Sequence, residues 1–358
     1  MKNFTKHLFL EKMVRSFLIF LIFLSFSNLA YAQVEKNFTA RKTVERIKGD
    51  FTLIGNHNIT VKNNPIDGDN NSENMDYVDI DTDNTTVNSS SANLVFSTEN
   101  GAIASQSKIK FAGLYWTGRA HTGSISPDTF TVGSVSLNKR VVKLKVPGTS
   151  TYQNITANTT DIRYPSGTNA NMYVAFADVT TIIEPLSNKN GTYTVANIAL
   201  READPTDDTG YYGGWALIVV YENDKMNWRD VVVFDGYAYV AGNVTADFNI
   251  PVTGFKTTDT GAVNMKLGVM AGEGDRKISG DNLQILKHST ISDWVSLNHT
   301  DNSTTNFFNS SIYSYTNNVK NPRNPDHTNN FGLDISMFNI ANSNNSVIKN
   351  NQTSTTFN

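Results

Sequence analysis

One apolar stretch, GGWALIVVY at residues 213–221, restricts the fold of this chain more than any other. Its large side chains, from Trp215 to Tyr221, occupy both of the alternating sets of positions, so a β-strand here would bury both faces. Such a strand belongs inside a packed sheet. Residues 229–236 (RDVVVFDG) predict a second strand. The polar loop between the two is too short for a parallel crossover, so the pair is predicted to form an antiparallel hairpin.

Short alternating stretches recur along the chain between turn-forming residues. Residues 33–62 predict two or three strands with a turn at Gly55-Asn56, and Asp178 and Pro185 delimit one short helix. Further strands are expected at 107–117, 129–135, 140–146, 192–200 and 262–270. The pattern predicts an all-β fold, an antiparallel β-sandwich or jelly-roll-like architecture, formed as one module or as two packed sandwich lobes with at most one or two short helices.

Composition excludes several functional classes. Charged residues are 18% of the chain and the formal net charge is −3, which provides no electrostatic footprint for nucleic acid or an anionic membrane. The absence of cysteine excludes disulfides, thiol chemistry and cysteine-bound metal clusters.

The first residues predict export. Basic residues from Lys2 to Arg15 precede an apolar run at 17–26, and Ala30-Tyr31-Ala32 matches a small-x-small cleavage pattern. The apolar run is shorter than the roughly twenty residues that span a bilayer. We therefore expect a signal peptide over 1–32, a secreted or outer cell-surface module over 33–357 without a membrane span, and, if there are two lobes, a boundary near 201–213.

Several motifs together resemble one family of large bacterial surface proteins. They include YVDID at 77–81, NSSSA at 88–92, AGLYW at 112–116, ADVT at 177–180, GTYTVAN at 191–197, the stretch 214–222, VFDG at 233–236, GEGD at 272–275, GD at 280–281, FNSSI at 308–312 and NNFGLDI at 329–335. Their order is similar to the N-terminal module of Bacteroidetes (flavobacterial) adhesin-like proteins associated with gliding and type IX secretion sorting domains.

The resemblance implies a non-catalytic module that acts in adhesion or matrix assembly, with a cell-surface or extracellular matrix polymer or protein as its partner. It supplies no catalytic residue. Because such relatives continue into further β-domains, the end at Asn358 suggests a C-terminally truncated product. The alternative is a secreted carbohydrate-binding or carbohydrate-active protein on a jelly-roll scaffold, where catalysis would need two carboxylates roughly 5 to 9 Å apart across a sugar.

Two acidic clusters are candidate metal sites, and Ca²⁺ is the cofactor they suggest. On an extended strand Asp79, Asp81 and Asp83 share one face, and Ca²⁺ prefers several oxygen ligands. The simpler interpretation is a solvated acidic strand end. A second, weaker candidate consists of Glu273, Asp275 and Asp281 in a glycine-rich turn.

Aromatic residues and histidines supply the remaining candidates. Trp116 and Trp215 lie in apolar stretches, which favours core packing over sugar stacking. Met226 and Trp228 lie at the tip of the predicted hairpin and are candidate partner contacts, with packing back onto the sheet as the alternative. The histidines lack metal-ligand spacing and are expected at the surface; they include His57, His121, His288, His299 and His327.

Overall fold

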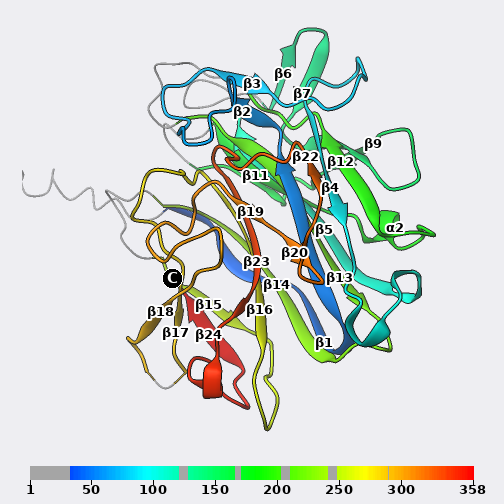
Figure 1. Cartoon of the computed structure of the whole chain (residues 1–358). Coiled ribbons are helices and arrows are strands. Elements are labelled where there is room, and N and C mark those ends of the chain that lie inside the picture. Colours follow the sequence, from blue (N-terminus) through cyan, green and yellow to red (C-terminus); the bar gives the residue numbers. More distant parts are fainter. Residues whose placement is uncertain (1–32, 121–127, 166–170, 203–209, 241–247, 289) are drawn as a thin grey trace, which may run out of the picture.

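The computed structural model describes residues 33–120, 128–165, 171–202, 210–240, 248–288 and 290–358. The chain is all-β with curled antiparallel sheets, consistent with a β-sandwich, which confirms the predicted fold class (Figure 1). No helix in these ranges is long and apolar enough to cross a membrane. The predicted signal peptide lies outside the described residues, as do residues 203–209 of the predicted lobe boundary.

A six-stranded sheet forms the centre of the molecule, in the order β10-β11-β5-β13-β1-β14. Its strands are β1 (Gln33–His57), β5 (Lys108–Arg119), β10 (Ile162–Arg163), β11 (Met172–Asp178), β13 (Gly213–Glu222) and β14 (Trp228–Tyr239). A seven-stranded sheet has the order β22-β4-β12-β8-β7-β6, with β9 paired to β8. Its strands are β4 (Ser89–Leu94), β6 (Thr129–Val132), β7 (Val135–Asn138), β8 (Val141–Lys145), β9 (Gln153–Thr156), β12 (Gly191–Ala196) and β22 (Arg323–Asn324).

Smaller sheets formed mainly by the C-terminal part complete the fold. The four-stranded sheet contains β15 (Ile250–Thr253), β24 (Ser354–Phe357), β17 (Gln284–Leu286) and β18 (Trp294–Ser296). The three-stranded sheet contains β16 (Met265–Gly272), β23 (Leu333–Ile340) and β19 (Ile312–Tyr313). Two pairs remain, β2 (Ile59–Val61) with β3 (Met75–Tyr77), and β20 (Tyr315–Thr316) with β21 (Val319–Lys320). Short helical turns are η1 (Glu99–Gly101), η2 (Ala104–Gln106), α2 (Thr180–Ile183) and η4 (Ser343–Asn345).

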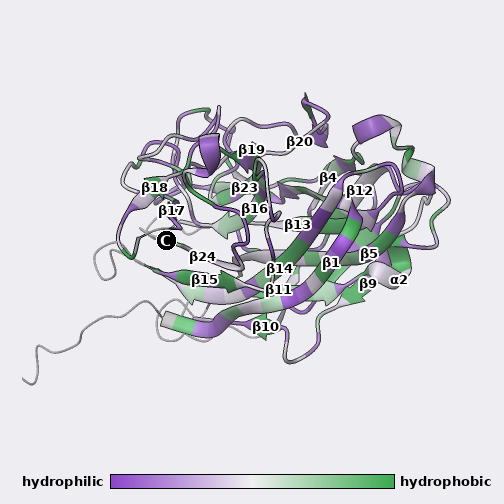
Figure 2. Ribbon diagram, turned by 90° about the horizontal axis from the view of Figure 1, so that it is seen from below, coloured by the Kyte–Doolittle hydropathy of each residue, from purple (hydrophilic) through white to green (hydrophobic). Residues whose placement is uncertain are grey.

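Strand β13 is buried on both faces, as its sequence predicts. Trp215 and Leu217 belong to the main core, which fills the space between the six- and seven-stranded sheets. On the opposite face, Ala216 packs in a second core with Leu333 and Ile335 of β23. Figure 2 shows hydrophobic and hydrophilic residues interleaved along the long strands around this centre. The strand therefore joins the sandwich to the C-terminal sheets.

Residues 33–62 form two strands, within the predicted number, but β1 runs without interruption over residues 33–57 and the break before β2 falls at Asn58. The predicted turn at Gly55-Asn56 is instead paired strand, opposite Ala216 and Trp215. A Cβ atom on Gly55 would lie 2.1 Å from the Trp215 carbonyl oxygen and 2.4 Å from Ile335 Cδ1. Glycine occupies this position because two packed elements approach the backbone closely, and not because the chain turns.

The predicted hairpin of β13 and β14 is also wrong in its pairing. Within the described residues these strands do not pair with each other; both are antiparallel to β1. Glu222 of β13 lies opposite Gly49, and Trp228 of β14 lies opposite Lys48. The loop at 223–227 therefore connects β13, which pairs with residues 49–57 of β1, to β14, which pairs with residues 33–48. A short loop between two strands restricts their separation but does not require them to be partners.

Replacement of Trp215 by alanine tests the central role of β13. Trp215 is fully buried and its indole N–H donates to Ser90 Oγ at 2.9 Å. We expect Trp215→Ala to lower the free energy of unfolding by about 3 to 5 kcal/mol, measured by chemical denaturation. Trp228→Ala is the matched control, because that side chain is 67% exposed, and should change stability by no more than about 0.5 kcal/mol. Equal effects of the two substitutions would contradict the assignment.

Candidate functional site

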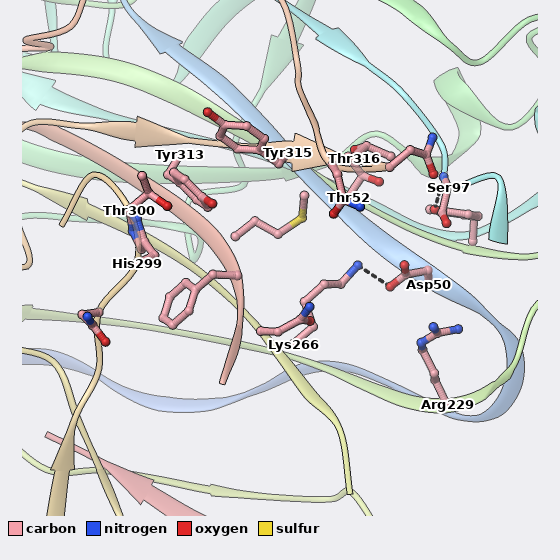
Figure 3. A pocket seen from close by; sticks show the side chains of 17 residues that line it. Asp50, Thr52, Ser97, Arg229, Lys266, His299, Thr300, Tyr313, Tyr315 and Thr316 are labelled. Atoms are coloured by element: carbon pink, nitrogen blue, oxygen red, sulfur yellow. Dashed lines mark hydrogen bonds and ion pairs between the residues drawn. The ribbon is translucent and has the colours of Figure 1, made fainter. Parts of the chain in front are cut away.

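A pocket of about 460 Å³ lies where the central sheet meets the C-terminal strands (Figure 3). Strand β1 supplies Asp50 and Thr52, β14 supplies Arg229, and β16 supplies Lys266. The opposite wall comes from the segment 298–300, from β19 and β20, and from β23. Its volume is within the range of small-molecule binding sites.

Stacked rings form one wall of the pocket. Tyr313 and Tyr315 have ring centroids 4.4 Å apart, and His299 stacks on Tyr313 at 4.1 Å. His299 is fixed by Ser336 Oγ, 3.0 Å from Nε2, and by the Asp301 backbone N–H, which donates to Nδ1 at 3.3 Å. Burial lowers the pKa of His299 to about 4, so the wall is uncharged at neutral pH.

An ion pair forms the opposite side of the pocket. Lys266 Nζ contacts the carboxylate of Asp50 and donates to the Phe51 carbonyl oxygen at 2.8 Å (Figure 3). The ammonium group also lies 4.4 Å from the centroid of the Phe51 ring. Burial lowers the pKa of Lys266, although the charge of Asp50 opposes this effect. Asp50 and Thr52 reach the same pocket because alternate residues of a strand share one face.

A second ion pair fixes the end of the pocket. Arg229 donates to both carboxylate oxygens of Glu99, at 2.7 and 2.8 Å, and to the Gly49 carbonyl oxygen at 2.8 Å. The hydrogen bonds from Arg229 lower the pKa of Glu99 to about 2. Together with Lys266 and Asp50, these groups form two cation–anion pairs whose charges cancel.

This combination of groups suits a polyhydroxylated ligand. The residues that line the pocket include threonines at 52, 300 and 316 and asparagines at 298, 317, 318 and 339. Hydroxyl and amide groups both donate and accept hydrogen bonds, as sugar hydroxyls do. An aromatic face provides an apolar surface for the C–H face of a sugar ring. The arrangement can therefore bind and orient a saccharide.

The three carboxylates of the acidic segment from Asp79 to Asp83 each accept hydrogen bonds from neighbouring residues. Asp79 accepts from Ser89 Oγ at 2.6 Å, and Asp83 accepts from the backbone N–H of Thr85 at 2.9 Å. Asp81 accepts from Tyr152 OH and from Thr86 Oγ1. Within the described ranges no group of three or more His, Cys, Asp or Glu side chains is placed to hold a metal ion.

Glu273, Asp275 and Asp281 lie close enough to influence one another electrostatically. Burial, together with the charge of Asp275, raises the pKa of Glu273 to about 8, and burial followed by the charge of Asp69 raises the pKa of Asp275 to about 6. Burial also raises the pKa of Asp281. The neighbouring Asp334 of β23 belongs to the same group, although the sequence analysis did not select it.

The structure agrees with the predicted core positions of Trp116 and Trp215, but not with the predicted partner contact of Met226. Trp116 and Trp215 are fully buried. Met226 is only 2% exposed and packs in the main core, so it is not available for the predicted contact. Trp228 is 67% exposed and remains a predicted partner contact. The loop fixes Met226 inward because the backbone at 223–226 closes a turn, with the Met226 N–H donating to Asn223 O.

The expectation of surface histidines is wrong for His57. This residue is fully buried, and its Nε2 lies 3.0 Å from Nδ1 of His327. His299 is partly buried in the pocket wall, whereas His121 lies outside the described residues. Histidines 57, 299 and 327 sit in polar stretches of sequence, and burial there results from long-range packing that a local pattern does not reveal.

The pocket residues escaped the sequence analysis because they are far apart along the chain. Asp50 and Lys266 come from β1 and β16, which are separated by more than half of the chain. One usable signal was Tyr313-Ser314-Tyr315, where two aromatic residues at alternate positions can share a face.

Comparisons with known proteins do not assign the chain to a family. No protein-family model matches it, and no curated protein matches it.

The neutral state of His299 predicts an acid-sensitive stability. Its folded pKa of about 4 is below the ordinary value of 6.5, so the unfolded chain binds the proton first as pH falls. Stability is therefore fully present above pH 6.5 and is lost toward pH 4. We expect this residue to account for a loss of about 1 to 2 kcal/mol between pH 7 and 5, measured by denaturant unfolding at each pH.

His299→Gln provides the control, because glutamine keeps a polar side chain but does not titrate. The variant should lose this part of the pH dependence, whereas His57, whose pKa is also lowered by burial, should still contribute. An unchanged slope in His299→Gln would show that His299 does not titrate as its burial implies.

Proposed function

We propose that this chain is a non-catalytic module of a secreted or cell-surface adhesin-like protein, and that it binds a saccharide in the pocket beside Tyr315. The observation that carries the proposal is the composition of the pocket, in which an aromatic wall faces polar residues and paired ionic groups. Adhesion or matrix assembly follows if the saccharide belongs to a surface or matrix polymer.

Binding is favoured over hydrolysis by the carboxylates. Among the described residues, Asp50 is the only carboxylate that lines the pocket, and it is engaged by Lys266. Most glycoside hydrolases use two carboxyl groups on either side of the scissile bond. The alternative, a carbohydrate-active protein, would therefore need a second acid from outside this pocket.

The predicted signal peptide and the motif order support the proposed location outside the cell. Export would also bring the module into contact with the matrix polymer that we propose as its partner. A pocket whose ion pairs cancel also suits a neutral saccharide better than a strongly charged one.

A glycan array with the purified chain tests the saccharide proposal, followed by calorimetry with the best glycan. Tyr315→Ala should weaken binding at least about tenfold, because it removes a ring from the wall. Tyr315→Phe keeps the ring and should bind within about threefold, and Ile291→Ala, at a 95% exposed position outside the pocket, should bind like the unaltered chain. An array without ligands, or equal binding by Tyr315→Ala, would refute the proposal.

Incubation with the bound glycan separates binding from hydrolysis. We expect no new reducing ends after prolonged incubation. Release of reducing ends that disappears in Asp50→Asn would favour the carbohydrate-active alternative.

A further inference from the structure

Several buried acceptor oxygens that lack a hydrogen-bond donor lie at one end of the three-stranded sheet, outside the pocket. Strand β16 ends at Gly272, opposite Leu333, where β23 begins, and β19 runs parallel to β23 from Ile312. The loops that meet at this end, 273–281 and 301–311, therefore lie beside the first residues of β23 (Figure 1).

Asp334 is the most deeply buried acid at this end. It is 2% exposed, and its Oδ1 accepts from the Ser311 backbone N–H at 3.0 Å. Its Oδ2 has no close hydrogen-bond partner among the described residues, although the backbone N–H groups of Ser310 and Asn309 also act on the carboxylate. That atom faces the 273–281 loop, because a Cβ atom on Gly274 would lie 2.2 Å from Oδ2 and 2.3 Å from the Phe308 carbonyl oxygen. A buried oxygen without a donor costs free energy unless a cation or a proton compensates it.

Neighbouring amide oxygens are also without donors. Asn306 Nδ2 donates to the carbonyl oxygens of Asp275 and Arg276 at 3.3 and 3.0 Å, and Asn309 Nδ2 donates to the Asp301 carbonyl oxygen at 2.8 Å. These bonds fix the orientation of both amides. The buried Oδ1 atoms of Asn306 and Asn309 then have no partner in the described parts of the chain.

Four acidic side chains also gather at this end, where the 273–281 loop carries Arg276 and Lys277 as well. Asp281 lies within electrostatic range of Glu273, Asp275 and Asp334. Within the described ranges none of these four acids forms an ion pair, although Arg119 acts on Glu273. In the described ranges no three acidic side chains are grouped closely enough to hold a metal ion by themselves. Neutral oxygens must therefore supply part of the coordination shell of a cation bound here.

We propose that this end of the sheet binds a divalent cation of the Ca²⁺ type, held by the carboxylates of Asp334 and Asp281 together with neutral amide or backbone oxygens. Ca²⁺ takes six to eight oxygen ligands from carboxylates, asparagine and backbone carbonyls and water. Asp281 is exposed and lies within electrostatic range of Asp334. Of the two acidic clusters selected from the sequence, the proposal assigns the cation to the one around Glu273, Asp275 and Asp281.

Calorimetric titration of the chelator-treated full chain with CaCl₂ tests the site. We expect one Ca²⁺ per chain with a dissociation constant of roughly 10⁻⁵ to 10⁻³ M, and a melting temperature higher by about 5 °C at saturation. MgCl₂ at the same concentrations should bind at least about tenfold more weakly, because Mg²⁺ demands a stricter octahedral geometry.

Two matched variants locate the cation. Asp281→Asn removes one charge from an exposed ligand and should weaken Ca²⁺ binding at least tenfold while the circular dichroism spectrum is unchanged. Asp83→Asn removes one exposed charge from the other acidic segment and should bind Ca²⁺ within twofold of the unaltered chain. No heat of binding and no thermal shift in millimolar CaCl₂ would overturn the proposal. So would loss of binding in Asp83→Asn alone, or equal binding of Mg²⁺ and Ca²⁺ in all variants.

Discussion

Trp215 and Trp116 lie opposite each other on β13 and β5, and both indoles are fully buried. Each N–H has a partner, Ser90 Oγ for Trp215 and the Lys139 carbonyl oxygen for Trp116, so the rings enter the core without an unsatisfied donor. The six- and seven-stranded sheets close over this pair. The opposite face of β13 is covered by β23, which places the C-terminal sheets beside β1 and forms the pocket between them.

The pocket and the acidic sheet end share one segment of chain. Residues 298–300 line the pocket, and residues 301–311 run along the oxygens around Asp334. His299 and Ser336 connect the aromatic wall to β23, two residues from Asp334. The two proposed sites remain chemically distinct, because one combines rings with balanced ion pairs and the other gathers oxygen acceptors.

The local sequence pattern was enough to predict the fold class and the burial of β13. Large apolar residues at both sets of alternating positions of a strand must be buried on both faces. The pattern failed at residues whose conformation or burial depends on a partner that is far away in the sequence. Gly55 was assigned to a turn, although its missing side chain accommodates Trp215 and Ile335. His57 was assigned to the surface, although it pairs with His327 in the interior. The acidic cluster at 273–281 could be selected from its sequence, but Asp334 could not, because its burial depends on strands that come together only in the fold.

The long strand β1 has a consequence for the order in which the chain acquires structure. Gln33 pairs with Tyr239 and Gly49 with Glu222, so the first strand of the described chain waits for partners that are synthesised much later. Loop closure over such separations is slow, and an unpaired strand exposes its backbone until it is complete. The pairing of residues 33–57 can therefore be completed only after both β13 and β14 have been made.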